Sequence, residues 1–64
     1  MKIVKIDNYN RESISDVLIA ENVPSSYAET IVTMLNQKFG GRYSSRFYVV
    51  KPNDYKLYKF DPNN

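Results

Sequence analysis

Residues 26–41 read SYAETIVTMLNQKFGG and carry the strongest periodic signal in the chain. The apolar side chains recur at the spacing of one helix face: Ala28, Ile31, Val32, Leu35 and Phe39. Polar side chains fall on the opposite side: Thr30, Thr33, Asn36 and Gln37. Ser26 and Glu29 form a capping box, and Gly40-Gly41 supplies the left-handed residue that ends a helix. We therefore predict a helix from Ser26 to Phe39.

A second helix is predicted immediately upstream. Ser13 and Asp16 fit a capping box, and Asn10 is a competing N-cap one turn earlier. Three apolar residues follow at helical spacing: Ile14, Val17 and Leu18. Pro24 ends this helix, because the residue before a proline is pushed out of the α region.

Strands are predicted at both ends of the chain. Lys2–Ile6 is rich in β-branched residues, as a short strand is. Arg46–Lys51 and Tyr55–Phe60 are two further such runs, and Pro52-Asn53 between them suits a type I turn. The expected order is β-α-α-β-β. This is an α+β fold in which two helices pack on one face of a small antiparallel sheet.

The predicted C-terminal hairpin has two apolar faces, and two short helices can cover only one of them. Phenylalanine has no polar atom to satisfy, whereas tyrosine tolerates one wet end. We therefore expect Phe47, Val49 and Phe60 inside, packed against three residues of the helices: Leu18, Ile31 and Leu35. A one-residue change of register would reverse this assignment. The face left exposed is the predicted partner-binding surface: Arg46, Tyr48, Val50, Tyr55, Leu57 and Lys59.

Length and composition limit what the chain can be. Its 64 residues suffice for one domain, expected over residues 1–60 with a frayed tail at 61–64. Apolar residues make up 42% and charged residues 25%, as in ordinary globular proteins. The longest apolar run has four residues, so no membrane span is expected. The N-terminus lacks the apolar stretch of a signal peptide, and we expect a cytoplasmic protein.

The sequence lacks the residue types that several classes of catalysis and metal binding require. The chain has no cysteine and no histidine, which excludes disulfides, thiolate nucleophiles, zinc sites of the usual kind and Ser-His-Asp catalysis. The seven acidic residues are spread singly, and no glycine-rich phosphate loop is present. The sequence therefore predicts no enzyme, no catalytic residue, no metal site and no cofactor.

Charge is distributed unevenly along the chain. Residues 1–37 hold three basic and five acidic residues, whereas residues 38–64 hold six basic and two acidic ones. This permits an acidic partner, although lysines on a hairpin also discourage aggregation. Nucleic acid is the alternative partner, bound through a winged-helix-like arrangement or as a single strand on the basic aromatic hairpin. The predicted helix over 26–39 has no cation before Lys38, and the net charge is only +2.

The segments YAETIVTMLNQKFGG (27–41), FYVV (47–50) and DYKLYKFDP (54–62) resemble small accessory proteins encoded by bacteriophages. The resemblance implies a compact α+β protein that binds a host protein and inhibits or redirects it in the host cytoplasm. It carries no functional residue over to this chain. The function expected from the sequence is therefore non-catalytic protein binding, to a host protein or to a second copy through the exposed sheet face.

Overall fold

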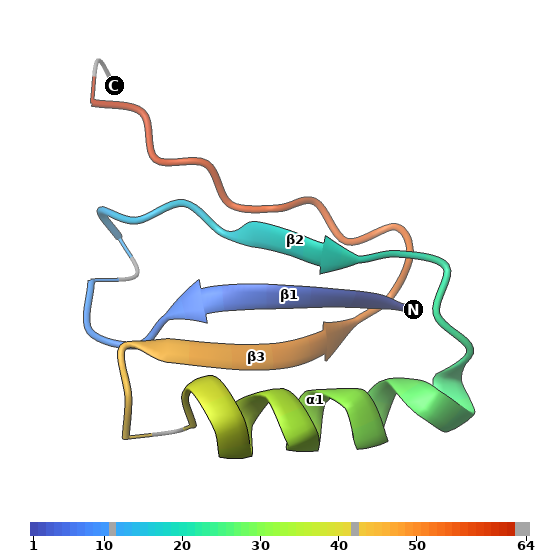
Figure 1. Ribbon diagram of the computed structural model, residues 1–64. Coiled ribbons are helices and arrows are strands. Elements are labelled where there is room, and N and C mark those ends of the chain that lie inside the picture. Colours follow the sequence, from blue (N-terminus) through green and yellow to red (C-terminus); the bar gives the residue numbers. More distant parts are fainter. Residues whose placement is uncertain (11, 42, 63–64) are drawn as a thin grey trace.

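Three antiparallel strands and one helix make up the fold in the computed structural model, which describes residues 1–10, 12–41 and 43–62 (Figure 1). They are β1 (Lys2–Asp7), β2 (Val17–Ala20), α1 (Ser25–Phe39) and β3 (Arg46–Lys51). The strand order is β2-β1-β3, so β1 lies in the centre. The predicted α+β class is confirmed. The prediction of two helices is wrong, because the described residues contain one.

The pairing of β1 with β3 forms the core of the sheet. Lys2 lies opposite Lys51, and the register continues without a break to Asp7 opposite Arg46. Ile3 and Val4 point to opposite faces of the sheet, and both are fully buried. A central strand must bury both of its faces, which explains why β1 is continuously apolar at this point.

β2 replaces the predicted upstream helix. The backbone N–H groups of Ser13 and Ile14 both bond to the carbonyl oxygen of Asn10, which makes one turn. The chain then extends and pairs antiparallel with β1, with Leu18 opposite Val4. The run Val-Leu-Ile-Ala has two β-branched residues and is only four residues long. Few apolar residues of this segment follow helical spacing, so the helix has little to stabilise it. Pairing with the free edge of β1 is therefore favoured over the helix.

α1 is the predicted long helix, and it begins one residue earlier than expected. Pro24 occupies the N-cap position, and no side-chain hydrogen bond caps this end. Instead, the Pro24 carbonyl oxygen accepts bonds from the N–H groups of Tyr27, at 2.9 Å, and Ala28, at 3.1 Å. The predicted capping box of Ser26 and Glu29 is therefore wrong.

The turn from α1 to β3 requires glycine. A Cβ at Gly40 would lie 2.1 Å from the carbonyl oxygen of Arg46. Gly41 has a φ of +121°, and its N–H donates to the same carbonyl oxygen at 3.0 Å. The pair therefore ends the helix, as predicted, and also brings the chain back against the start of β3.

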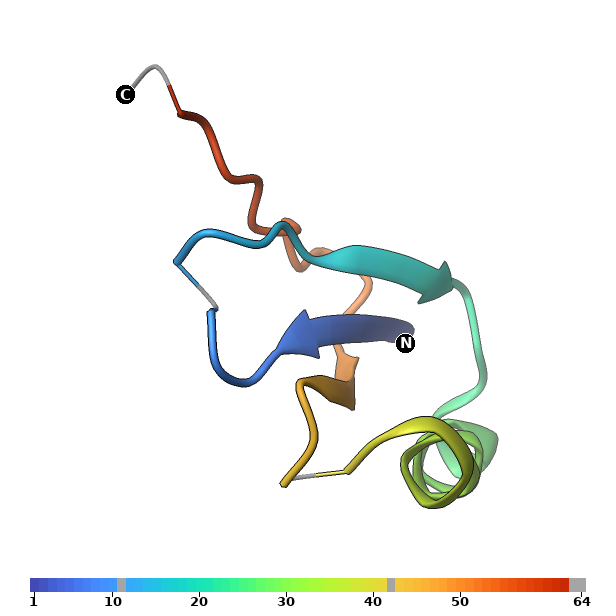
Figure 2. The ribbon, with the colours of Figure 1, turned by 60° about the vertical axis from the view of Figure 1, so that its left-hand side comes forward.

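α1 lies along β3 and leaves β2 uncovered (Figure 2). Its buried residues are Ala28 and Val32, and Val32 packs with Ile3 and Tyr48 in the core. The Cα atoms span 39 × 27 × 11 Å, so the molecule is a thin slab with the helix toward one side of the sheet. The sheet therefore has one covered edge, at β3, and one edge at β2 that the helix does not reach.

A side chain of α1 closes the outer edge of β3. The Asn36 amide nitrogen donates to the Tyr48 carbonyl oxygen at 2.9 Å, and the Asn36 amide oxygen accepts from the Tyr48 N–H at 2.8 Å. Asn36 thus imitates a neighbouring strand. The sequence placed this residue on the polar side of the helix, which is wrong.

The C-terminal segment, residues 52–62, is not the second strand of a hairpin. The predicted turn is present, since the Tyr55 N–H bonds to the Pro52 carbonyl oxygen at 3.0 Å. Beyond it the chain leaves β3 and runs toward the β2 side of the sheet (Figure 1). The ammonium of Lys2 donates to the Tyr55 carbonyl oxygen at 2.9 Å. Lys2 neighbours Ile3 in the strand, so the backbone at Tyr55 lies toward the sheet face opposite α1.

The predicted tail begins at the end of this segment. Asp61 and Pro62 are exposed, and residues 63–64 lie outside the described residues.

Candidate binding surfaces

The predicted partner-binding surface does not exist as one face. Of its β3 members, Arg46 is exposed, Tyr48 is 7% exposed in the core, and Val50 is half-buried against the core. The expectation that Phe47 and Val49 face the helix is wrong, because Ile3 pairs with Val50 and this fixes which side chains point toward α1. Phe60, also expected in the core, is 44% exposed.

The other three members lie in the C-terminal segment, which does not pair with β3 (Figure 1). Tyr55 and Leu57 are half-buried, and Lys59 is exposed. The ammonium of Lys51 lies 5.0 Å from the centre of the Tyr55 ring. The six residues are thus divided between β3 and the C-terminal segment and do not form one face of a hairpin.

Asp16 attaches the C-terminal segment to the sheet. Its Oδ2 accepts bonds from the Tyr55 hydroxyl, at 2.6 Å, and the Tyr58 N–H, at 2.9 Å. The Asp16 N–H donates to the Tyr58 carbonyl oxygen at 2.8 Å, and the Phe60 N–H donates to Ser15 Oγ at 2.9 Å. The Asp16 side chain is 7% exposed, and its Oδ1 has no hydrogen-bond partner among the described residues. A buried carboxylate with two donors is a structural clamp.

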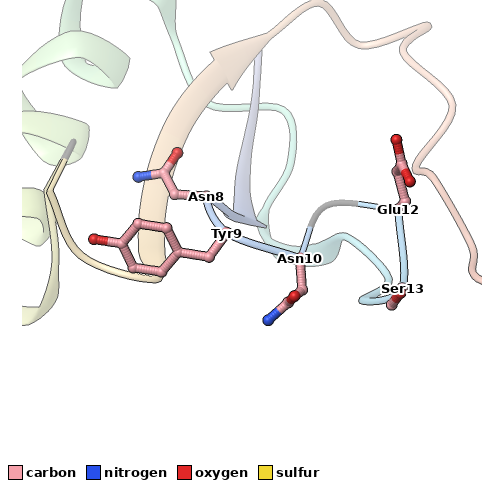
Figure 3. Close-up of a pocket in the computed structure, with 5 residues that line it drawn as sticks. All are labelled: Asn8, Tyr9, Asn10, Glu12 and Ser13. Atoms are coloured by element: carbon pink, nitrogen blue, oxygen red, sulfur yellow. The ribbon is translucent and has the colours of Figure 1, made fainter.

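A polar hollow of about 310 Å³ lies beside the loop that follows β1, and five residues line it: Asn8, Tyr9, Asn10, Glu12 and Ser13. Figure 3 shows that their side chains do not converge, since Asn10 and Glu12 point away from each other. The Asn8 amide donates to the carbonyl oxygens of Gly41 and Ser44, and the Tyr9 hydroxyl donates to that of Tyr43. These bonds fasten the loop, so the hollow offers no convergent set of groups for a ligand.

Apolar side chains are exposed along one side of α1. Tyr27 is 64% exposed, Ile31 37% and Met34 62%. With the exposed Lys38 they follow the 4-3-4 spacing of a helical seam. We call these four residues the α1 seam. Beside it lies a shallow hollow of about 260 Å³ lined by Ile31, Met34, Leu35, Lys38 and Phe39.

The β2 edge, meaning the outer side of Val17–Ala20, is the second place where apolar side chains are exposed, and the C-terminal segment runs beside it (Figure 1). Val17 is 43% exposed, Leu18 39% and Ile19 44%. The register with β1 shifts beside Ile3, which places an irregularity within β2. This strand carries neither lysine nor proline, the residues that commonly protect an edge.

Sequence reasoning missed both surfaces, although a signal existed for one. The 4-3-4 spacing of the α1 seam is visible in the sequence, but only Ile31 of its four residues was assigned to a face, and that face was expected to be buried, whereas Ile31 is 37% exposed. The exposure of β2 followed only from recognising that the segment is a strand. The pairing of Asp16 with the C-terminal segment spans about forty residues and has no local signal.

Two kinds of feature are absent from the part of the chain that the structure describes. It contains no group of three or more acidic side chains placed to hold a metal ion. No helix within it is long and apolar enough to cross a membrane. In comparisons with protein-family models, curated proteins and solved structures, none matches the chain.

Proposed function

We propose that this protein is a non-catalytic, cytoplasmic protein-binding module whose β2 edge takes up an extended segment of another protein as an added strand. The observation that carries the proposal is the exposure of Val17, Leu18 and Ile19 on an edge strand that α1 leaves uncovered. Binding of this kind draws affinity from main-chain hydrogen bonds and specificity from alternate side chains. It agrees with the resemblance to phage accessory proteins that bind host proteins.

The backbone of β2 supports this mode of binding. The Asp16 N–H bonds outward to Tyr58, away from β1. Because backbone groups alternate along a strand, the N–H and C=O of Leu18 point to the same outer side. No backbone hydrogen bond joins Leu18 to the described part of the C-terminal segment. An incoming strand would therefore meet the donor and acceptor of Leu18 once it displaces the C-terminal segment, which runs beside β2 from the point where Asp16 holds Tyr58 (Figure 1).

The charges around β2 favour a partner segment with basic flanking residues. Glu21 directly follows the strand and Glu12 precedes it, and both are exposed. They favour an apolar segment flanked by lysine or arginine. A second copy of β2 fits poorly, because antiparallel self-pairing would set Asp16 opposite Glu21 of the other copy, and like charges directly opposite are destabilising.

The nucleic-acid alternative receives less support from the arrangement of the elements. It required either two consecutive helices or a basic hairpin with exposed aromatic rings. The described residues contain one helix, and Tyr48 is buried. Protein binding is therefore the function that the exposed surfaces favour.

A library of random peptides displayed on yeast tests the proposal. Peptides enriched by the wild-type protein should alternate apolar residues and carry a flanking lysine or arginine. Titration of an enriched peptide should show at least a tenfold loss of affinity in Ile19→Lys, since a lysine protects an edge strand. The matched control is Gln37→Lys, which adds the same charge on the exposed polar side of α1. Equal binding by Ile19→Lys and wild type, or no enrichment of alternating peptides, would refute the proposed function.

A further inference from the structure

A second interaction surface, independent of β2, lies on α1. The helix has three sides. One side packs on the sheet through Ala28 and Val32. A second side is polar and exposed, and includes Thr33 and Gln37. The α1 seam forms the third side, between the other two, and neither the fold nor solubility explains its large apolar side chains.

We propose that two copies of this protein associate through the α1 seam, with their helices antiparallel. A twofold axis between Ile31 and Met34 sets Ile31 of each copy opposite Met34 of the other. The same axis sets Tyr27 of each copy opposite Lys38 of the other. In a heptad assignment, Tyr27 and Met34 occupy d positions, and Ile31 and Lys38 occupy a positions. Antiparallel helices pack a residues against d residues, which matches these pairs.

This match argues for a second copy as the occupant. A twofold interface uses the same patch on both molecules, so the patch must be complementary to itself. The α1 seam meets this condition at both layers. Ile31 and Met34 form an apolar centre. The Lys38 ammonium lies 5.6 Å from the centre of its own Phe39 ring, and in the dimer it would turn to the Tyr27 ring of the other copy as a cation–π contact. The β2 edge fails the same condition because its flanking residues, Asp16 and Glu21, are both acidic.

The size of the seam limits the strength of the dimer. A helix of 15 residues is about 22 Å long. The surface area that four side chains from each copy can bury is smaller than the ~1,200 Å² at the lower end of standard interfaces. Standard interfaces of ~1,600 Å² bind with dissociation constants from about 1 μM downward, so we expect a weaker, reversible dimer whose population changes over protein concentrations on the order of 10 μM to 1 mM.

Sedimentation velocity over that concentration range tests the proposal. The wild-type protein should shift from monomer toward dimer. Met34→Glu places a charge opposite Ile31 and should weaken the dimer by at least tenfold. Gln37→Glu introduces the same side chain on the polar side of α1 and should leave the dimer unchanged. A wild-type monomer at every concentration, or a dimer that Met34→Glu leaves intact, would overturn the proposal.

Cysteine cross-linking tests the orientation, because the chain has no cysteine of its own. In the antiparallel arrangement, a mixture of Ile31→Cys and Met34→Cys chains should form a disulfide-linked heterodimer faster than either variant alone. Faster cross-linking of Met34→Cys with itself would indicate parallel helices and would refute the proposed pairing. Circular dichroism of each variant confirms that α1 is intact.

Discussion

Replacing Asp16 by alanine should release the C-terminal segment from the sheet without unfolding the domain. Asp16 accepts two hydrogen bonds, from the Tyr55 hydroxyl and the Tyr58 N–H. Bonds to a charged group contribute about 1.5–3 kcal/mol each. The unpaired Oδ1 is buried, and its desolvation offsets about 1–3 kcal/mol of this gain. The net loss of unfolding free energy should therefore be about 2 kcal/mol.

A domain of this size shifts its melting temperature by roughly 4–8 °C per kcal/mol. Asp16→Ala should therefore melt about 8–16 °C below wild type. It should remain folded at 25 °C, because small domains have about 3–5 kcal/mol of stability. Thermal melts followed by circular dichroism measure the first effect. Hydrogen exchange at the Tyr58 amide, which donates to Asp16, measures release of the segment directly.

Asp54→Ala is the matched control for this change. Asp54 is an exposed acid in the same C-terminal segment, so its removal should cost less than ~0.5 kcal/mol. The reasoning is wrong if Asp16→Ala melts within ~2 °C of wild type while the Tyr58 amide keeps its protection. In that case the segment would be held by its apolar contacts, and Leu57→Ala would have the larger effect.

Three further changes test the packing of the fold by thermal or denaturant melts. Asn36→Ala removes both bonds to the backbone of Tyr48 and should cost about 1–3 kcal/mol, whereas the neighbouring exposed change Gln37→Ala should stay within ~0.5 kcal/mol. Tyr48→Ala should cost about 3–5 kcal/mol because its ring is buried, and Phe60→Ala should cost far less; the reverse result would restore the predicted hairpin faces. Ser26→Ala should change stability by less than ~0.5 kcal/mol, since no side chain caps α1.

The elements with strong local signals could be predicted from the sequence. α1 repeats its apolar spacing over three turns and ends at a glycine pair, so its existence did not depend on distant contacts. β1 and β3 are rich in β-branched and aromatic residues, which fit a pleated and half-buried surface. β2 was ambiguous, because apolar residues at Ile14, Val17 and Leu18 satisfy a helix and leave a short strand equally possible. Pairing with β1 decided between them, and a local pattern contains no information on such a partner.

The prediction of a C-terminal hairpin is wrong for a related reason. Tyr55–Phe60 alternates like a strand, and its nearest partner in sequence is β3. In the structure both edges of β3 are already occupied, one by β1 and the other by Asn36 of α1. The C-terminal segment therefore crosses the sheet and meets Asp16 instead. The predicted binding surface assumed this hairpin, so its six residues were assigned to one face that does not form.

The two proposed surfaces lie on opposite sides of the sheet, with β1 and β3 between them (Figure 1). A dimer through α1 would therefore leave both β2 edges accessible and present two strand-binding sites. Two linked sites raise the apparent affinity for an immobilised partner without any new contact. We expect Met34→Glu to bind a free peptide as tightly as wild type, but to dissociate faster from a surface densely coated with that peptide. A parallel loss of affinity for the free peptide would show that the two surfaces are coupled and that strand binding at β2 requires the dimer.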